Sequence, residues 1–271
     1  MFEAFSDFSG TQQKNDRLSV ACFLYEKSAS QKLDDFWKDR LDPILRPLPE
    51  HKRFFHMTEF MAHEPPYDLL HMSDGERLSI RHDLIESASK GLEFAAVCHL
   101  SVTDYDKEVP EHSHARKLMG GPLAMCGIWA LDAISEHLNK KNVPGEIAYF
   151  FECGDLGQDE LEQRIKQVSA SRFYVERYRY GGHAFVPKTK HHALAAADML
   201  AWEYRNGIEE YFKDPEAHRS GPFFEQLFSP PVTALHFSEN NIRMRSLSES
   251  IQKAKHWARQ REEELGNDSP S

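Results

Sequence analysis

The apolar run from Ile147 to Phe151 constrains the fold of this chain more than any other stretch. It lies in the segment GEIAYFFEC, residues 145–153, which is the most strand-like part of the sequence. A strand that is apolar on both faces is typical of a central strand covered on both sides. Glu152 and Asp155 follow the run directly. The segment therefore predicts a layered α/β fold in which carboxylates stand at the end of a buried strand.

The segments around this strand alternate between strand and helix patterns. Met1 to Phe5 and Arg17 to Tyr25 are joined by polar residues, which predicts an antiparallel hairpin at the start of the sheet. Further strands are expected at Phe54 to Met57, Leu92 to Val102 and Arg172 to Tyr180, with a turn at Gly181 to His183, and helices at Ala29 to Leu45, Glu76 to Lys90, from Pro122 onward, Gln158 to Ser169 and His191 to Arg205. This order predicts a mixed sheet with helices on both faces.

Strand character is lost beyond Tyr211. We therefore expect one main domain over residues 1–212, with a helical insertion at about residues 61–91. Residues 213–271 are predicted to hold loops and a C-terminal extension, a charged amphipathic helix from Ser246 to Leu265. The last residues, Gly266 to Ser271, form a tail that is expected to be disordered.

Composition limits the partners of the chain. The formal net charge of −10 means that a polyanion needs a local basic patch or bridging metal ions to bind. No apolar run reaches the roughly 18 residues of a membrane span, and the N-terminus has no secretory pattern. The four cysteines are far apart, which favours buried free thiols in a reducing cytoplasm over a zinc site.

Asp198 lies in the middle of the Ala-rich helix predicted from His191 to Arg205. On a helical wheel it shares the apolar face with Leu194 and Ala201, so it should point at the core. A buried carboxylate is costly unless a cation meets it. Two interpretations remain open: an ion pair with Arg205 or with a lysine from elsewhere, or a metal ligand.

Other carboxylates also stand near predicted strand ends, and each has an ordinary alternative. Asp7 ends the first strand but suits a turn, since Ser9 and Gly10 follow it. Glu59 follows the strand predicted from Phe54 to Met57; the alternative is that it is an ordinary carboxylate on the surface. Asp155 suits the N-cap of the next helix. Glu152 is the hardest of these acids to explain by packing alone.

If the first and central strands are neighbours, Asp7, Glu152 and Asp155 converge, and Asp198 needs only to pack across them. Clustered carboxylates cannot all stay ionised without a cation. Ligands that are all oxygens select Mg²⁺ or Mn²⁺, and a pair of such ions roughly 4 Å apart promotes phosphodiester hydrolysis. Cations near the cluster could contact phosphate: Lys188 or Lys190 at its rim, and Arg177 and Arg179 on a strand that is otherwise an exposed edge.

Four motifs give the chain a family resemblance: Asp followed by Ser-Gly in the opening hairpin, Phe-His-x-x-Glu, Glu-x-Gly-Asp after the central strand, and Ala-Ala-Asp-Met-Leu-Ala-Trp. Over about Met1 to Tyr211 the chain resembles the bacterial family called domain of unknown function 3800, which is similar to ribonuclease-H-like nucleases. The resemblance implies a mixed five-stranded sheet and divalent-metal nuclease chemistry. It maps the acids onto five positions: Asp7, Glu59, Glu152, Asp155 and Asp198. Phe8 stands where the family usually has Glu, so one metal position would be weakened if that Glu is a ligand.

Three functions are compatible with these residues. The first is a phosphodiesterase that uses Mg²⁺ or Mn²⁺ on DNA or RNA, with Asp7, Glu152, Asp198 and Lys188 as catalytic residues. The second is a non-catalytic ribonuclease-H-like module that binds a protein or nucleic acid, which Phe8 favours. The third is a metal hydrolase of a small phosphoester, because the net charge attracts long polyanions poorly.

Overall fold

The computed structural model describes residues 1–10, 16–154, 157–213 and 232–237. Their framework is a mixed six-stranded sheet in the order β5-β4-β1-β2-β3-β6. β1 pairs antiparallel with β2, and β2 with β3, whereas β4 runs parallel to β1, β5 to β4 and β6 to β3. The strand bounds are β1 Phe2–Ser9, β2 Arg17–Glu26, β3 Leu92–Ser101, β4 Ile147–Glu152, β5 Tyr180–Val186 and β6 Val232–Phe237.

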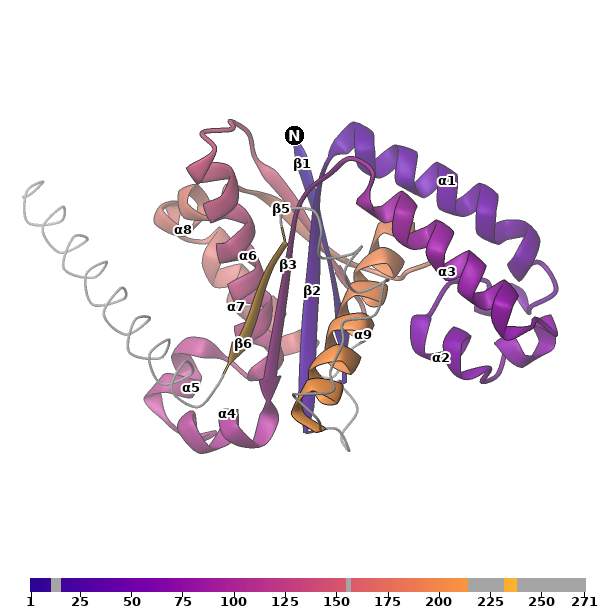
Figure 1. Ribbon diagram of the computed structural model, residues 1–271. Helices are drawn as coiled ribbons and strands as arrows, with labels where there is room; N and C mark the ends of the chain where they lie inside the picture. Colours follow the sequence, from indigo (N-terminus) through magenta and orange to yellow (C-terminus); the bar gives the residue numbers. More distant parts are fainter. Residues whose placement is uncertain (11–15, 155–156, 214–231, 238–271) are drawn as a thin grey trace, which may run out of the picture.

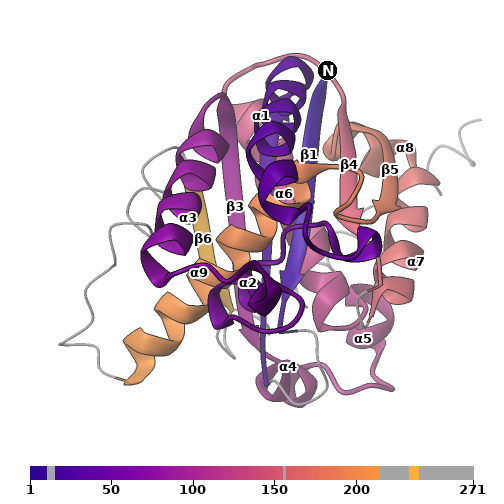
Figure 2. The same ribbon diagram turned by 90° about the vertical axis from the view of Figure 1, so that its right-hand side faces the viewer.

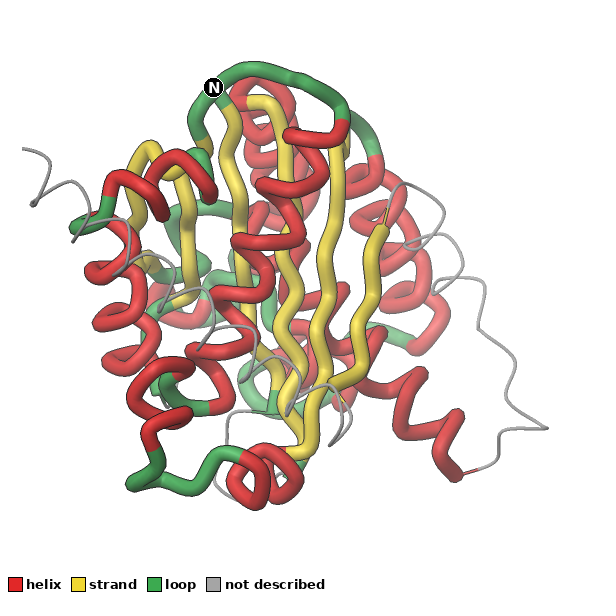
Figure 3. Tube along the Cα trace, turned by 90° about the vertical axis from the view of Figure 1, so that its left-hand side faces the viewer, coloured by secondary structure: helices red, strands yellow, loops and turns green. Residues whose placement is uncertain are grey.

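Helices cover both faces of the sheet (Figures 1 and 2). One face carries α1 (Lys27–Leu45), α2 (Met57–Ala62), α3 (Asp74–Ser89) and α9 (His192–Lys213). The other face carries α6 (Pro122–Lys140) and α7 (Gln158–Ser169), with α8 (Arg172–Arg177) beyond α7. Two short helices, α4 (Val102–Glu108) and α5 (His114–Met119), follow β3. Figure 3 shows the strands lying side by side between the two helical layers.

The sheet separates two hydrophobic cores, and strand alternation decides which core each side chain enters. In β1, Phe2, Ala4 and Phe8 enter the core beneath α6. Phe5 enters the opposite core, together with the buried face of α9. Asp7 has the same parity as Phe5, so its side chain faces α9. The alternation of this one strand therefore places a carboxylate under the helix that carries Asp198.

The expected architecture is confirmed: an opening antiparallel hairpin, a mixed sheet and helices on both faces, as in a ribonuclease-H-like fold. The strand count is wrong, because Val232–Phe237 adds β6 beside β3. Those six residues follow two prolines, in a part of the chain that was expected to lack strands. The charged helix and tail predicted for residues 246–271 lie outside the described residues.

Two strands were predicted at the wrong places. Phe54 to His56 is irregular and leads into α2, which begins at Met57; the apolar side chains serve the core, where Phe55 packs against Trp37. Residues 172–180 mostly form α8, in which Tyr174 stacks on Tyr178 at helical spacing. The strand is instead β5, which includes Gly181 and Gly182, the glycines that suggested a turn.

The predictions for cysteines and membranes have mixed outcomes. None of the four cysteines forms a disulfide; Cys22, Cys98 and Cys126 are buried as expected, but Cys153 is exposed. Among the described helices, none has both the length and the apolar composition of a membrane span.

Candidate functional site

Strand register brings Asp7 and Glu152 together at one end of the sheet. The last paired positions of β1 and β4 are Ser6 and Phe151, so Asp7 and Glu152 come next on adjacent parallel strands. Both side chains take the face on which Phe5 stacks against Phe150, with ring centroids 5.1 Å apart. The expected neighbourhood of the first and central strands is therefore confirmed.

Asp198 reaches the same point from α9. Small and apolar residues of this helix, including Ala195 and Ala201, are buried and let the helix backbone lie close to the sheet. Asp198 is only 2% exposed. Its Oδ2 atom accepts a hydrogen bond of 2.7 Å from the backbone N–H of Met57, the first residue of α2. Asp198 is thus fixed from both sides, by its own helix and by the start of α2.

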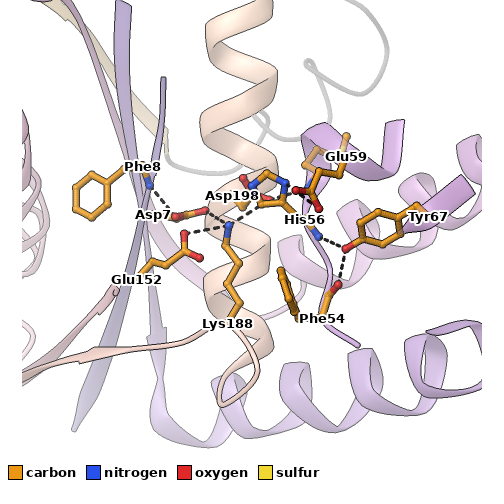
Figure 4. A network of polar contacts seen from close by, with 10 residues as sticks. Asp7, Phe8, Phe54, His56, Glu59, Tyr67, Glu152, Lys188 and Asp198 are labelled. Atoms are coloured by element: carbon orange, nitrogen blue, oxygen red, sulfur yellow. Dashed lines mark hydrogen bonds and ion pairs between the residues drawn. The ribbon is translucent and has the colours of Figure 1, made fainter. Parts of the chain in front are cut away.

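Lys188 lies at the centre of these three acids (Figure 4). Its Nζ atom is 3.0 Å from Asp7 Oδ2, 3.0 Å from Glu152 Oε2 and 3.5 Å from Asp198 Oδ2. The residue is only 4% exposed, so the expectation of a lysine at the rim is wrong. Lys188 comes two residues after the end of β5. Because β5 pairs with β4, this position brings the Lys188 ammonium close to Glu152 at the end of β4. Of the two interpretations of Asp198, the ion pair with a distant lysine is present.

The electrostatics of the cluster are unbalanced. Burial raises the pKa of Asp7 well above its usual value; Lys188 opposes this shift, and Glu152 and Asp198 add to it. Burial also acts to raise the pKa of Asp198, but Lys188, His56 and the Met57 N–H outweigh it and lower that pKa. Burial would lower the pKa of Lys188, yet the three acids raise it well above its usual value. Three carboxylates thus share one ammonium, and Asp7 is the least compensated.

Glu59 and His56 extend the cluster on the side of α2. His56 Nδ1 lies 4.0 Å from Glu59 Oε2, and neither buried atom has a hydrogen-bond partner within the described residues. The hydroxyl of Tyr67 accepts from the His56 N–H at 2.8 Å and donates to the Phe54 carbonyl, which holds this segment in place. Sequence analysis did not assign a role to His56, although the Phe-His-x-x-Glu motif contains it.

Arg177 and Arg179 are not part of this arrangement. Asp155 lies outside the described residues. Arg177 pairs with Asp132 at 2.7 Å, and Arg179 hydrogen-bonds Asn139. Both arginines precede β5 whereas Lys188 follows it, so roughly 20 Å of strand separates them. The four cations predicted as one basic patch, Arg177, Arg179, Lys188 and Lys190, therefore do not form one.

Phe8 does not occupy a ligand position. Its side chain is in the core beneath α6, where it stacks on Phe151 at 6.5 Å. The pairing of β1 with β2 is regular from Phe2 to Ser9, so position 8 faces away from Asp7. An acid at this position would enter the apolar core, and the cluster as built loses no ligand through Phe8.

Phe8→Glu should therefore destabilise the fold without adding a metal ligand. Truncating a buried Phe costs about 3–5 kcal/mol, and burying an unpaired carboxylate adds to that cost. We expect a loss of at least that size in denaturant unfolding, with Phe8→Leu losing much less. Tighter Mn²⁺ binding by Phe8→Glu would show instead that position 8 can turn toward the cluster.

The donor atoms suit Mg²⁺ or Mn²⁺ in kind, because the three acids offer only oxygens. Among the described residues, however, no three His, Cys, Asp or Glu side chains are arranged so that they could hold a metal ion at once. The Lys188 ammonium fills the point on which the oxygens converge. A separate cavity of about 510 Å³ lies near α6, and none of these acids lines it.

No family model matches the chain, and no curated protein matches its sequence. Solved structures match the chain only at low similarity. The structure of the ribonuclease H2 from Pyrococcus horikoshii OT3 is 12% identical, with 91% of this chain and 99% of that chain covered and a TM-score of 0.42. A chain of the PCNA:RNase HII complex from Archaeoglobus fulgidus is 15% identical, covers 84% and 87%, and has a TM-score of 0.38. At such values, neither likeness transfers a substrate or a catalytic residue.

Proposed function

We propose that this protein is a divalent-metal-dependent phosphodiesterase that cleaves nucleic acid. One observation carries the proposal: carboxylate oxygens from β1, β4 and α9 converge on a single buried cation at the end of the sheet. Gathering three acids in a buried place is costly, and three charge pairs to one lysine do not repay that cost fully. A bound divalent ion would compensate the negative charge of these acids more fully than the ammonium does.

Asp7, Glu152 and Asp198 would hold Mg²⁺ or Mn²⁺, and Glu59 and Asp155 remain predicted further ligands. Such an ion, when bound, stabilises the attacking and leaving oxygens of a phosphodiester. The Met57 N–H fixes the orientation of the Asp198 carboxylate, so this ligand is placed before any metal binds. Lys188 supplies a positive charge that can meet a phosphate oxygen beside the acids.

The choice of nucleic acid over a small phosphoester is a proposal about the substrate, since the net charge of −10 repels long polyanions. Attraction must then come from the site itself, and binding should weaken strongly as salt is raised. Mononucleotides and a small chromogenic phosphodiester, tested beside single- and double-stranded DNA and RNA, decide between the two substrate classes.

A second candidate is a non-catalytic binding module, and the position of Lys188 favours it. An ammonium within 3.5 Å of all three acids could satisfy them permanently, as in a structural ion-pair cluster. Such a module would bind no Mn²⁺ and would cleave no phosphodiester in any buffer.

Glu152→Gln should reduce metal-dependent cleavage by on the order of 10²–10³-fold, because it removes one charged oxygen ligand while keeping the shape of the side chain. Glu146→Gln is the matched control: Glu146 is exposed just before the other end of the same strand, and its replacement should leave cleavage unchanged. Cleavage is followed with labelled DNA and RNA in Mg²⁺, Mn²⁺ or EDTA. Cleavage that persists in EDTA, or no cleavage of any substrate by the wild-type protein, contradicts the proposed function.

A further inference from the structure

The Lys188 ammonium stands where a bound metal ion would have to stand. Three carboxylate oxygens from three separate elements lie within 3.5 Å of Nζ, and the side chain is almost fully buried. Oxygen ligands hold Mg²⁺ at about 2.1 Å, closer than any of these oxygens lies to Nζ. An ion bound by all three oxygens must therefore take the point that the ammonium now occupies.

Like charges make shared occupancy unfavourable. A divalent ion and an ammonium held a few ångströms apart in a buried site repel each other strongly. The exchange of the ammonium for a divalent ion is favourable for the acids, because the ion offers them two positive charges in place of one. Exchange of the ammonium for a divalent ion is therefore favourable, but the two cations cannot occupy the site together.

The chain around Lys188 permits the exchange. Lys188 lies in a short turn between β5 and α9, closed by the hydrogen bond of 2.9 Å from the Lys190 N–H to the Pro187 carbonyl. The lysine stem has four rotatable carbons, so the ammonium can leave the cluster by side-chain rotation without a change of backbone. Lys190, two residues further along the same turn, is already exposed.

We propose that Lys188 is a resident counter-cation that competes with the metal: it holds Asp7, Glu152 and Asp198 together in the metal-free protein and leaves the cluster when a divalent ion binds. The proposal rests on the metal-binding role given to the site above. It adds a second state of the same site, in which the acids hold the metal and the released ammonium is exposed to solvent.

The first test is the affinity for Mn²⁺, measured by calorimetry on the wild type, Lys188→Met and the control Lys190→Met. Removing the competing charge should tighten Mn²⁺ binding by about tenfold or more in Lys188→Met. The same variant in EDTA should melt roughly 10 °C lower, because three buried acids lose their cation. Lys190→Met should match the wild type in both measurements.

The second test needs no variant. Amines of the wild-type protein are acetylated in EDTA and in saturating Mn²⁺, and the labelling rates of Lys188 and Lys190 are compared by mass spectrometry. Lys188 should be protected in EDTA and should approach the rate of Lys190 in Mn²⁺. Protection in both buffers, while calorimetry shows Mn²⁺ bound, overturns the proposal even if Lys188→Met fails to fold.

The outcomes separate this proposal from the proposed function. Equal Mn²⁺ affinity in the wild type and Lys188→Met overturns only the competition. Binding by Lys188→Met alone supports the competition and contradicts metal chemistry in the wild-type protein. No binding by either protein overturns both.

Discussion

Asp7→Asn should raise the stability of the metal-free protein and at the same time abolish metal-dependent cleavage. Burial holds the pKa of Asp7 well above its usual value, so its ionised form is disfavoured in the fold even beside Lys188. An asparagine has the shape of the protonated acid, and its amide can donate to Glu152 as that acid would. We expect a gain of about 1–2 kcal/mol in EDTA, measured by urea unfolding, with a loss of cleavage on the order of 10³-fold.

The gain should depend on pH in one direction. A group whose pKa is raised by folding stabilises the fold below its unfolded pKa, and this contribution is lost as the pH rises through the folded value. The advantage of Asp7→Asn over the wild type should therefore vanish in acid and grow as the pH rises from the unfolded pKa of Asp7 towards its folded pKa. Asp39→Asn, on the exposed side of α1, should show neither effect. A loss of stability at neutral pH would mean that Lys188 compensates Asp7 fully.

Sequence patterns were sufficient to place the acids because the elements that carry them have strong signals. The continuous apolar run before Glu152 marks a central strand, and the hairpin of β1 and β2 leaves β1 free to pair with it. Strand alternation then fixes the face of Asp7, and the Ala-rich stripe of α9 fixes that of Asp198. Local periodicity thus determines most of this site.

The position of Lys188 could not be predicted in the same way, because β5 was assigned to the wrong residues. With the strand expected at residues 172–180, Lys188 was eight residues past its end and was expected at the rim of the cluster. The true strand ends at Val186. Gly181 and Gly182 concealed it, and the structure explains them: the register with β4 shifts at this point, and a Cβ on Gly181 would lie 3.0 Å from Glu146 Cβ.

The role of the segment before α2 was hidden for a different reason. Its alignment depends on contacts between residues far apart in sequence, which no local pattern encodes. Arg77 of α3 donates hydrogen bonds to the carbonyls of Phe60 and Tyr67, and Asp198 of α9 accepts from Met57. His56 is carried to the cluster by these contacts and by Tyr67, although it stands in no regular strand.

Asp198→Asn should have the opposite effect on stability from Asp7→Asn, while also abolishing cleavage. Asp198 is the acid that the fold stabilises in its charged form: Lys188, His56 and the Met57 N–H together lower its pKa in spite of burial. An asparagine can keep only one acceptor oxygen. The Met57 N–H and Lys188 Nζ both lie at Oδ2, so the amide oxygen can keep both contacts, but it loses the negative charge that pairs with Lys188. We expect a loss of about 1.5–3 kcal/mol in EDTA, the usual size of a hydrogen bond made to a charged group.

The pH dependence of this loss gives a second check. A group whose pKa is lowered by folding contributes stability above its unfolded pKa and loses it as the pH falls through the folded value. The deficit of Asp198→Asn should thus be present at neutral pH and shrink in acid, so the two variants approach the wild type from opposite sides. Because both variants remove a metal ligand, opposite changes in stability with the same loss of cleavage separate the catalytic use of the acids from their structural cost. Equal destabilisation by both would instead make the cluster a structural ion-pair network around Lys188.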